Sequence, residues 1–450
     1  MNWTLADKQV VVVGAGRTGC GLARFFLERG AQVVLSDARP AERVMLPDDL
    51  ARSVQRRDFG GHTVELFTAA DLVVISPGVP TDIPALCAAR QQGVPVLGEI
   101  EVASRSLSQP IIAITGTNGK STVTSLMGAM FQAWGQKTFI GGNLGTPLVE
   151  AVGQEWDWLV VELSSFQLET IEEFHPRFGV LLNISEDHLD RYPDMASYQA
   201  AKARLFENMT EQDVAVLNAD DPQVMTISET VRARKIMFSS SRSLADGMSL
   251  EGNQLVWKDA GVCERFSVEE LAISGQHNLE NVMAALIPPL LSGCPAETAW
   301  QAATAFRGLP HRMAMAGEIN GVRWFNDSKG TNIGSVVKSL EGNPGQVTLI
   351  AGGKDKQGSL VPLLEPVRQK VAHLVLIGEA ADRMQEAFSG LTEIYRASSM
   401  REAVAIASKI TPQGGTVLLS PGCSSFDMFK NFEERGQVFE DEVARLAKGV

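Results

Sequence analysis

Two kinds of feature are missing from this 450-residue chain, and each absence excludes a class of function. Basic side chains are in the minority, because 40 Lys and Arg face 53 Asp and Glu for a formal net charge of −13. Non-specific binding of nucleic acid depends on phosphate neutralisation by Lys and Arg, so we expect no nucleic-acid partner. No apolar run reaches the ~18 residues that span a bilayer, and the N-terminus lacks the cationic region of a signal peptide. We therefore expect no membrane partner.

The cysteines lack any spacing pattern. There are five of them: Cys20, Cys87, Cys263, Cys294 and Cys423. An odd number without CxxC or Cys/His spacing argues against a disulfide framework and against a structural zinc site. Reduced thiols and the absence of a targeting segment predict a cytoplasmic protein. Hydrophobic residues at 44% and charged residues at 21% are typical of a folded globular chain.

Short β-branched runs alternate with longer helical patterns, which predicts an α/β fold built from βαβ units with parallel sheet. The alternation starts afresh near residues 110 and 307, so we expect three domains: residues 1–98, 99–308 and 309–450. Residues 249–273 show short alternating stretches that predict a small satellite sheet. Residues 276–291 have a helical pattern, which we expect Pro288 and Pro289 to break.

A first glycine loop, GxGxxG, is formed by Gly14, Gly16 and Gly19 between a predicted strand and a predicted helix, and Asp37 ends the next strand. Glycines let the backbone approach a phosphate, the helix N-terminus carries partial positive charge, and the acid can hold a ribose hydroxyl. The pattern therefore indicates a nucleotide pyrophosphate. It does not distinguish NAD from another nucleoside diphosphate.

A second loop, TGTNGKST, joins a predicted strand at residues 111–115 to a helix. It departs from the GxxxxGK[ST] pattern because Ile114 takes the place of the first glycine. The required groups are still present: small residues for a nest of N–H donors, Lys120 for the β- and γ-phosphates, and the Ser121 hydroxyl for Mg²⁺. Two phosphate loops predict two different phosphorylated ligands.

Ionisable side chains follow the strands near this second loop. Glu162 ends one predicted strand, and His188 follows another in a run with the acids Glu186, Asp187 and Asp190. Ligands bind at the carboxyl ends of parallel strands, and a carboxylate is a natural ligand for a hard cation. We therefore expect Glu162 to bind metal. His188 is either a second metal ligand or a surface histidine, and both readings stay open.

Lys202 lies between Tyr198 and Phe206 at the spacing of one helix face. A lysine that aromatic rings desolvate loses its proton more readily. The simpler alternative is a lysine on the helix surface that pairs with an acid.

The chain resembles the Mur ligases of bacterial cell-wall synthesis, above all the members that add D-glutamate. The resemblance covers nearly the whole chain and rests on these motifs, in order: TGTNGKST, ELSSFQLE, NISEDHLDRY, YQAAKARLF, SGQHNLENV, LPHR, NDSKGTN, GGKDK and SPGCSSFDMFKNF. It implies a Rossmann-like N-terminal domain for UDP, a central P-loop ATPase domain, and a Rossmann-like C-terminal domain that closes over ATP and the amino acid.

The resemblance also implies an activity. ATP would phosphorylate the carboxylate of UDP-N-acetylmuramoyl-L-alanine, and D-glutamate would attack the acyl phosphate in peptidoglycan precursor synthesis. Two Mg²⁺ ions are implied, one bound by Ser121 and Glu162 and the other by His188 and Lys202. Because a cationic lysine cannot ligate a cation, Lys202 is expected to be carbamylated by CO₂. We expect a monomer.

The remaining site residues are assigned by the same resemblance. The catalytic residues would be Lys120, Glu162, His188 and Lys202. The UDP-substrate would contact Gly14, Gly16, Arg17, Thr18, Gly19, Asp37, Arg39, Ser76, Pro77, Gly78, Asn143, Ser164 and Gln167. ATP would contact Gly116, Thr117, Asn118, Gly119, Lys120, Ser121, Thr122, Asn278, Asn281, Arg312, Asp327 and Lys329. D-Glutamate would contact Thr331, Lys356, Ser425 and Phe432.

Two departures from the family pattern stand out. Gly330 takes the place of an alanine in NDSKATN, and we expect it to loosen a turn. The DNPR motif of the diaminopimelate-adding relatives is absent, which favours D-glutamate.

Two other functions remain as alternatives. An NAD-dependent dehydrogenase built on residues 1–98 leaves the second phosphate loop without a role. A nucleotide-switched binding protein of the GTPase kind would usually carry NKxD, which this sequence lacks.

Overall fold

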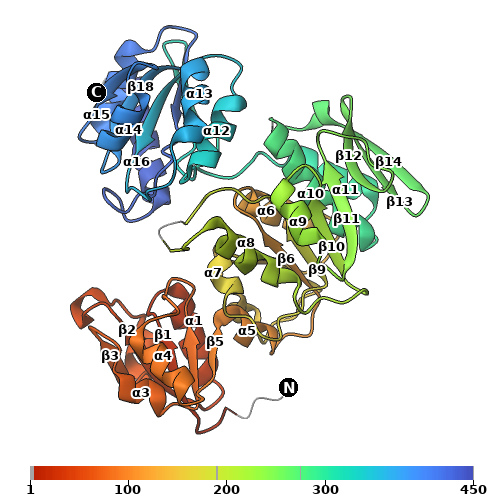
Figure 1. Cartoon of the computed structure of the whole chain (residues 1–450), viewed down its shortest axis with the longest axis vertical. Coiled ribbons are helices and arrows are strands. Elements are labelled where there is room, and N and C mark those ends of the chain that lie inside the picture. Colours follow the sequence, from red (N-terminus) through yellow and green to blue (C-terminus); the bar gives the residue numbers. More distant parts are fainter. Residues whose placement is uncertain (1–4, 189–190, 274, 449–450) are drawn as a thin grey trace.

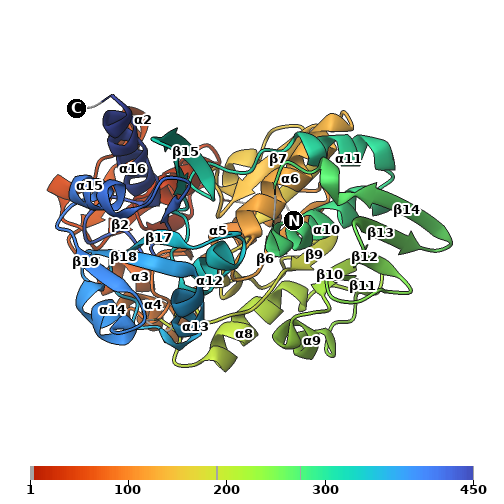
Figure 2. The same ribbon diagram turned by 90° about the horizontal axis from the view of Figure 1, so that it is seen from above.

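The computed structural model describes residues 5–188, 191–273 and 275–448. Three α/β lobes follow one another along the chain, each built on its own sheet (Figure 1). The N-terminal lobe (red to orange) and the C-terminal lobe (blue) lie at opposite ends of the long axis, both on the same side of the central lobe, as the view from above also shows (Figure 2). The fold class is therefore confirmed. The domain boundaries at residues 98 and 308 stay predictions.

The N-terminal sheet is parallel, with the order β3-β2-β1-β4-β5. Its strands are β1 (Gln9–Val13), β2 (Gln32–Asp37), β3 (Arg56–Phe59), β4 (Leu72–Ile75) and β5 (Val96–Gly98). Its helices are α1 (Arg17–Leu27), α2 (Asp48–Ser53), α3 (Val64–Thr68) and α4 (Pro84–Gln91), with a short 3₁₀ turn η1 (Ala41–Arg43). The order reverses at β1, which places the first glycine loop at the crevice where α/β sheets bind ligands.

The central sheet has the order β14-β13-β12-β11-β10-β9-β6-β8-β7. Its strands are β6 (Ile111–Thr115), β7 (Thr138–Gly142), β8 (Trp158–Glu162), β9 (Phe178–Leu181), β10 (Val214–Asn218), β11 (Arg234–Ser239), β12 (Gly247–Glu251), β13 (Gln254–Asp259) and β14 (Val262–Ser267). Its helices are α5 (Glu99–Ser104), α6 (Lys120–Ala133), α7 (Ser165–Leu168), α8 (Met195–Ala203), α9 (Pro222–Ser228), α10 (Gln276–Leu291) and α11 (Ala296–Ala305), with 3₁₀ turns η2 (Leu148–Ala151), η3 (Arg204–Phe206) and η4 (Val268–Glu270).

Two details of this lobe differ from the sequence-based expectations. The strands β12–β14 form as expected, but β12 pairs in parallel with β11, so they extend the central sheet and are not a separate satellite. Helix α10 also continues through Pro288 and Pro289. Both prolines lie in its last turns, so few hydrogen bonds are lost, and the Ser292 N–H donates to both proline carbonyls.

The C-terminal sheet has the order β15-β16-β20-β17-β18-β19, parallel except for β15 against β16. Its strands are β15 (Ala314–Ile319), β16 (Val322–Asn326), β17 (Val347–Gly352), β18 (Val371–Ile377), β19 (Glu393–Arg396) and β20 (Thr416–Leu419). Its helices are α12 (Ile333–Glu341), α13 (Val361–Lys370), α14 (Ala381–Phe388), α15 (Met400–Ile410) and α16 (Phe432–Ala447). Apolar side chains pack on both faces of this sheet. In the three described ranges, no helix is long and apolar enough to cross a bilayer.

Helix α5 joins the first two lobes through buried carboxylates. Glu101 is fully buried and accepts the backbone N–H groups of Glu172, Glu173 and Phe174. Glu99 Oε1 accepts the N–H of Val149 at 2.7 Å, whereas its Oε2 is buried without a hydrogen-bond partner in the described chain. These hydrogen bonds to Glu99 and Glu101 fix α5 against the central lobe.

Glu99 makes folding sensitive to pH. Burial raises the pKa of Glu99 from 4.5 to about 7, so the folded chain retains a proton that the unfolded chain releases. Stability should therefore fall as the pH rises from about 5 to about 8, by on the order of 3 kcal/mol. Glu99→Gln keeps an oxygen that can accept from Val149 and should remove this loss. Urea midpoints across that pH range test it, and parallel profiles for variant and wild type would contradict it.

Candidate active site

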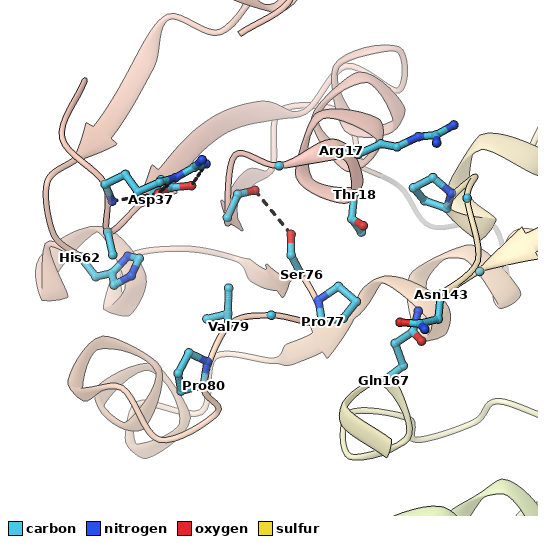
Figure 3. A pocket seen from close by; sticks show the side chains of 18 residues that line it. Arg17, Thr18, Asp37, His62, Ser76, Pro77, Val79, Pro80, Asn143 and Gln167 are labelled. Carbon is cyan, nitrogen blue, oxygen red and sulfur yellow. Dashed lines mark hydrogen bonds and ion pairs between the residues drawn. The ribbon is translucent and has the colours of Figure 1, made fainter. Parts of the chain in front are cut away.

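A cavity of about 540 Å³ lies between the first glycine loop and the central lobe (Figure 3). Eleven of the predicted UDP-site residues line it: Gly14, Gly16, Arg17, Thr18, Asp37, Arg39, Ser76, Pro77, Gly78, Asn143 and Gln167. Gly19 and Ser164 do not line the cavity but position segments that do. A Cβ on Gly19 would lie 1.6 Å from the Gly14 carbonyl oxygen, so Gly19 lets α1 pack against the loop. Ser164 forms a capping box with Gln167 at the start of α7.

Asp37 is buried and already fully paired. Its carboxylate accepts from the Ala15 N–H at 2.7 Å and from the Arg39 guanidinium at 2.7 and 2.9 Å. The Arg39 hydrogen bond, together with the backbone donors, holds the pKa of Asp37 well below its usual range. Asp37 therefore stays ionised and orients Arg39, a half-exposed cation at the cavity wall.

Sequence patterns missed several residues of this cavity, among them His62, Val79, Pro80, Gly145 and Pro147. They lie in loops outside the glycine motif. The signal available in the sequence was only their position after the strands β3, β4 and β7.

The second phosphate loop brings two lysines to one backbone oxygen. Lys120 Nζ donates to the carbonyls of Gly116 and Thr117 at 2.9 and 2.8 Å. Lys202 Nζ donates to the same Gly116 oxygen at 2.9 Å. Gly116 and Gly119 have φ of 148° and 91°, values that favour glycine. Because two of the loop's N–H groups donate to Asn183, the part of the loop left for an anion is the start of α6.

Lys202 is deeply buried, not a surface residue. It is 1% exposed, and its ammonium lies 4.7 Å from the centre of the Tyr198 ring. Burial, with the neighbouring Lys120 charge, lowers the pKa of Lys202 well below its ordinary value. Burial likewise lowers the pKa of Lys120, against the attraction of Glu162 and Asp187.

Glu162 and Ser121 offer the oxygens that a hard cation prefers. Glu162 Oε1 accepts from Asn143 Nδ2 at 2.7 Å, whereas Oε2 is buried and finds no hydrogen-bond partner in the described part of the chain. Ser121 Oγ accepts from Lys329 Nζ at 2.8 Å. The orphaned carboxylate oxygen fits a metal ion. Within the same ranges, no three His, Cys, Asp or Glu side chains gather into a metal-binding group; the predicted set relies instead on Ser121 and Lys202.

His188 is held by its backbone and by aromatic rings. It has a left-handed φ of 56°, and its ring meets that of Phe166 edge-on at 4.8 Å. Its neighbour Asp187 pairs with Lys356 at 3.1 Å. Burial opposes ionisation of Asp187, but Lys356 and His188 lower its pKa to about 2. Asp190 lies outside the described residues.

A second cavity, of about 470 Å³, opens beside the phosphate loop. Of the predicted ATP-site residues it is lined by Asn118, Gly119, Asn281, Arg312 and Asp327. Lys329 reaches Ser121, at the start of α6, through the hydrogen bond given above, and Asn281 donates to Asn278 at 3.4 Å. Sequence patterns missed His277, Glu280 and Lys338 on its wall.

Asp327 and Lys329 both have pKa values shifted from the ordinary ones. Asp327 is buried with hydrogen bonds from Ser339 and Ser420, and burial raises its pKa. Burial and Arg312 lower the pKa of Lys329 to about 8.

A third cavity, of about 250 Å³, lies between His188 and the C-terminal lobe. Lys356 lines it, together with Asp187, Arg383 and Cys423, which sequence patterns missed. Of the other predicted D-glutamate residues, Ser425 is buried and Phe432 packs 5.2 Å from the Lys329 ammonium. As the described residues define this cavity, Thr331, Ser425 and Phe432 are not on its wall.

Contacts across the cleft hold the C-terminal lobe against the phosphate loop. Asn332, the N-cap of α12, donates to Asp187 at 3.0 Å and to Asn118 at 3.3 Å. Ser335 Oγ donates to Asn118 at 2.7 Å. With the Lys329–Ser121 hydrogen bond, these contacts assemble one site from two lobes.

Gly330 lies in a turn closed by the hydrogen bond from its N–H to the Asp327 carbonyl, and the expected loosening stays a prediction. A Cβ at this position would lie 2.7 Å from Asp327 Oδ2 and 2.9 Å from Ser420 Oγ. The glycine lets the backbone pass directly against the buried Asp327 carboxylate.

Comparisons with known proteins agree along the whole chain. Three family models match: the Mur ligase MurD-like N-terminal domain at residues 8–98, the Mur ligase middle domain at 114–288, and the Mur ligase glutamate ligase domain at 311–423. The UDP-N-acetylmuramoylalanine–D-glutamate ligase of Syntrophotalea carbinolica is 60% identical over 96% of this chain and 97% of its own. The protein of the same name from Geotalea uraniireducens is 50% identical over 99% of both.

Solved structures share the fold at low identity. A pseudomurein peptide ligase type C from Methanothermus fervidus superposes with a TM-score of 0.63 at 17% identity, covering 98% of this chain and 100% of that one. UDP-N-acetylmuramate-alanine ligase from Thermotoga maritima gives 0.61 at 18% identity, with the same coverage.

Asn332→Ala should loosen the contact between the central and C-terminal lobes. It removes the cap of α12, worth about 1 kcal/mol, and both hydrogen bonds across the cleft. Small-angle scattering should give a larger radius of gyration for this variant than for wild type. Asn343→Ala is the matched control, because Asn343 is buried at the other end of α12 and donates only within that lobe, to Ser339. An unchanged radius for Asn332→Ala would contradict the assigned contact.

Proposed function

The chain belongs to the Mur ligase family, and from this premise we infer that it is an ATP-dependent ligase that joins D-glutamate to UDP-N-acetylmuramoyl-L-alanine in peptidoglycan precursor synthesis. The observation that carries this conclusion is the 50–60% identity to D-glutamate ligases over nearly their full lengths. A dehydrogenase and a GTPase-like switch both fail as alternatives, because neither explains a match that extends through all three domains.

The chemistry of amide formation explains why the site needs ATP. A carboxylate is a poor electrophile, because its leaving group would be oxide. Transfer of the terminal phosphoryl group to the L-alanyl carboxylate replaces oxide with phosphate. The amino group of D-glutamate then attacks the acyl carbon, the C–N bond forms, and phosphate leaves. The protein contributes positioning and neutralisation of charge.

We assign the phosphoryl step to the second phosphate loop. The N–H groups at the start of α6 bind phosphate oxygens, and Lys120 neutralises the charge that develops on the transferred group. Lys329 and Arg312 add positive charge from the C-terminal lobe, and Asn278 and Asn281 contact the nucleotide. The support is the hydrogen bond from Lys329 to Ser121, together with the 470 Å³ cavity that Asn118 and Gly119 of the same loop line.

Mg²⁺ is the ion that this chemistry requires, and it would neutralise and align the phosphates. Ser121 and Glu162 would hold one ion and His188 and Lys202 a second, the latter after carbamylation. The buried Glu162 Oε2 and the depressed pKa of Lys202 support this assignment. An uncharged amine is the form of lysine that adds to CO₂.

D-Glutamate carries two carboxylates, which cationic side chains can bind. We place it in the 250 Å³ cavity, where Lys356 is the nearest predicted contact. The 540 Å³ cavity takes the UDP part of the other substrate, with Asn143 and Gln167 toward the sugar. We further propose a monomer in the reducing cytoplasm, in keeping with five unpaired cysteines.

Phosphate release tests the proposed function directly. Wild-type protein supplied with ATP, Mg²⁺ and UDP-N-acetylmuramoyl-L-alanine should release phosphate when D-glutamate is added. L-Glutamate, L-lysine and diaminopimelate should give little. Lys120→Ala should be inactive, since it removes the positive charge at the transferred group. Release with another amino acid in place of D-glutamate would contradict the substrate assignment.

Lys202→Ala should be inactive, and acetate or another short carboxylate should partly restore turnover. The small acid would supply the carboxylate that carbamylation adds to the lysine. Lys137→Ala is the control, because Lys137 is 68% exposed and lines none of the three cavities. Failure of every short carboxylate to restore any activity would count against carbamylation.

A further inference from the structure

A part-buried hydrogen-bonded cluster supports one wall of the 540 Å³ cavity. His62, which follows strand β3, lines the cavity beside Asp37, at the end away from Asn143 and Gln167 (Figure 3). Behind it, Ser36 Oγ lies 2.8 Å from His62 Nδ1 and 2.8 Å from Asp58 Oδ2. These three residues belong neither to the glycine motif nor to the motifs that carry the family resemblance.

The order of donors in this cluster is determined. Burial works against ionisation of Asp58, but hydrogen bonds from Thr63 and Ser36 lower its pKa, so it is a carboxylate and can only accept. Ser36 must therefore donate its single proton to Asp58. The Ser36 oxygen therefore accepts in its contact with His62, and the proton of that hydrogen bond is on His62 Nδ1.

This arrangement selects one tautomer of His62. Burial lowers the pKa of the ring, although Asp58 and Asp37 oppose the shift, so the imidazole is neutral near pH 7.5. A neutral ring with its proton on Nδ1 has a bare Nε2, which is an acceptor. Ser36 is its sole hydrogen-bonding partner within the described ranges. Nε2 is therefore available to a ligand.

Two other side chains of this cavity, Asp37 and Gln167, have acceptor oxygens that are already used. Both oxygens of Asp37 accept from Arg39 or Ala15. At the opposite end, Gln167 Oε1 accepts from Ser164 within the capping box. A donor on the ligand near Asp37 would therefore find an acceptor at His62.

We propose that His62 determines nucleobase specificity, with Nε2 accepting a hydrogen bond from the N3–H of uracil. The proposal rests on the proposed function, which places UDP in this cavity. Uracil carries a donor at N3, whereas cytosine carries an acceptor there. Two acceptors facing each other repel, so the Ser36–Asp58 pair favours a uracil nucleotide over a cytosine nucleotide by keeping Nε2 unprotonated.

Binding of nucleoside diphosphates to the full chain tests the proposal. Isothermal titration at pH 7.5 compares UDP with CDP and with 3-methyl-UDP, in which a methyl group replaces the N3 proton. Wild type should prefer UDP over both by about tenfold or more, the effect of one hydrogen bond whose acceptor is left unpaired.

The matched variants locate that preference. His62→Ala removes the acceptor and opens space for the methyl group, so its preference for UDP over 3-methyl-UDP should fall below about threefold. His373→Phe, in the C-terminal lobe, should keep the wild-type ratio. Imidazole ¹⁵N NMR should show the Nδ1-protonated tautomer for His62 and a shift of Nε2 when UDP is added.

Two outcomes would overturn the proposal and are distinguishable. A wild-type ratio in His62→Ala would show that N3 faces another group, and would leave the ligase function intact. No binding of UDP to wild type would overturn both the His62 assignment and the UDP site on which the proposed function depends.

Discussion

The structure depends on two buried lysine amines that share one carbonyl oxygen, that of Gly116. Lys120 reaches it from the start of α6 and Lys202 from α8, so the loop between β6 and α6 is fixed from both sides. Two cations in a dehydrated space repel each other, and burial lowers the pKa of each. An anion, the loss of a proton, or the conversion of one amine into a negatively charged group would relieve this repulsion. Bound phosphates would supply the anion, and a carbamate on Lys202 would supply the negatively charged group.

The same loop is where the C-terminal lobe makes contact. Lys329 reaches Ser121, Asn332 reaches Asn118 and Asp187, and Lys356 reaches Asp187. A cleft that closes in this way excludes water from an acyl phosphate, which would otherwise hydrolyse. The N-terminal lobe has a different task. Glu99 and Glu101 of α5 fix it against the central lobe, and the 540 Å³ cavity lies between the two.

Sequence patterns predicted the parts of the site that lie within one loop or at one strand end. The two glycine loops and Glu162 lie at the carboxyl ends of β1, β6 and β8, and Lys120 follows the loop after β6, as the parallel-sheet pattern requires. Contacts between distant segments could not be predicted. Asn332 and Asp187 are 145 residues apart, and His62 acquires its tautomer only because β2 and β3 are paired. Lys202 is buried against the Gly116 carbonyl, which lies 86 residues away in the chain. The spacing of residues along α8 does not reveal this contact.

We propose that Lys202 is carbamylated because it is buried and lies beside the Lys120 charge. Carbon-13 NMR of the protein in labelled bicarbonate measures it directly. We expect a protein-bound carbamate resonance in wild type that is absent from Lys202→Arg and present in Lys137→Arg. Its absence from active wild-type protein at saturating bicarbonate would contradict the account of how a buried lysine becomes a metal ligand.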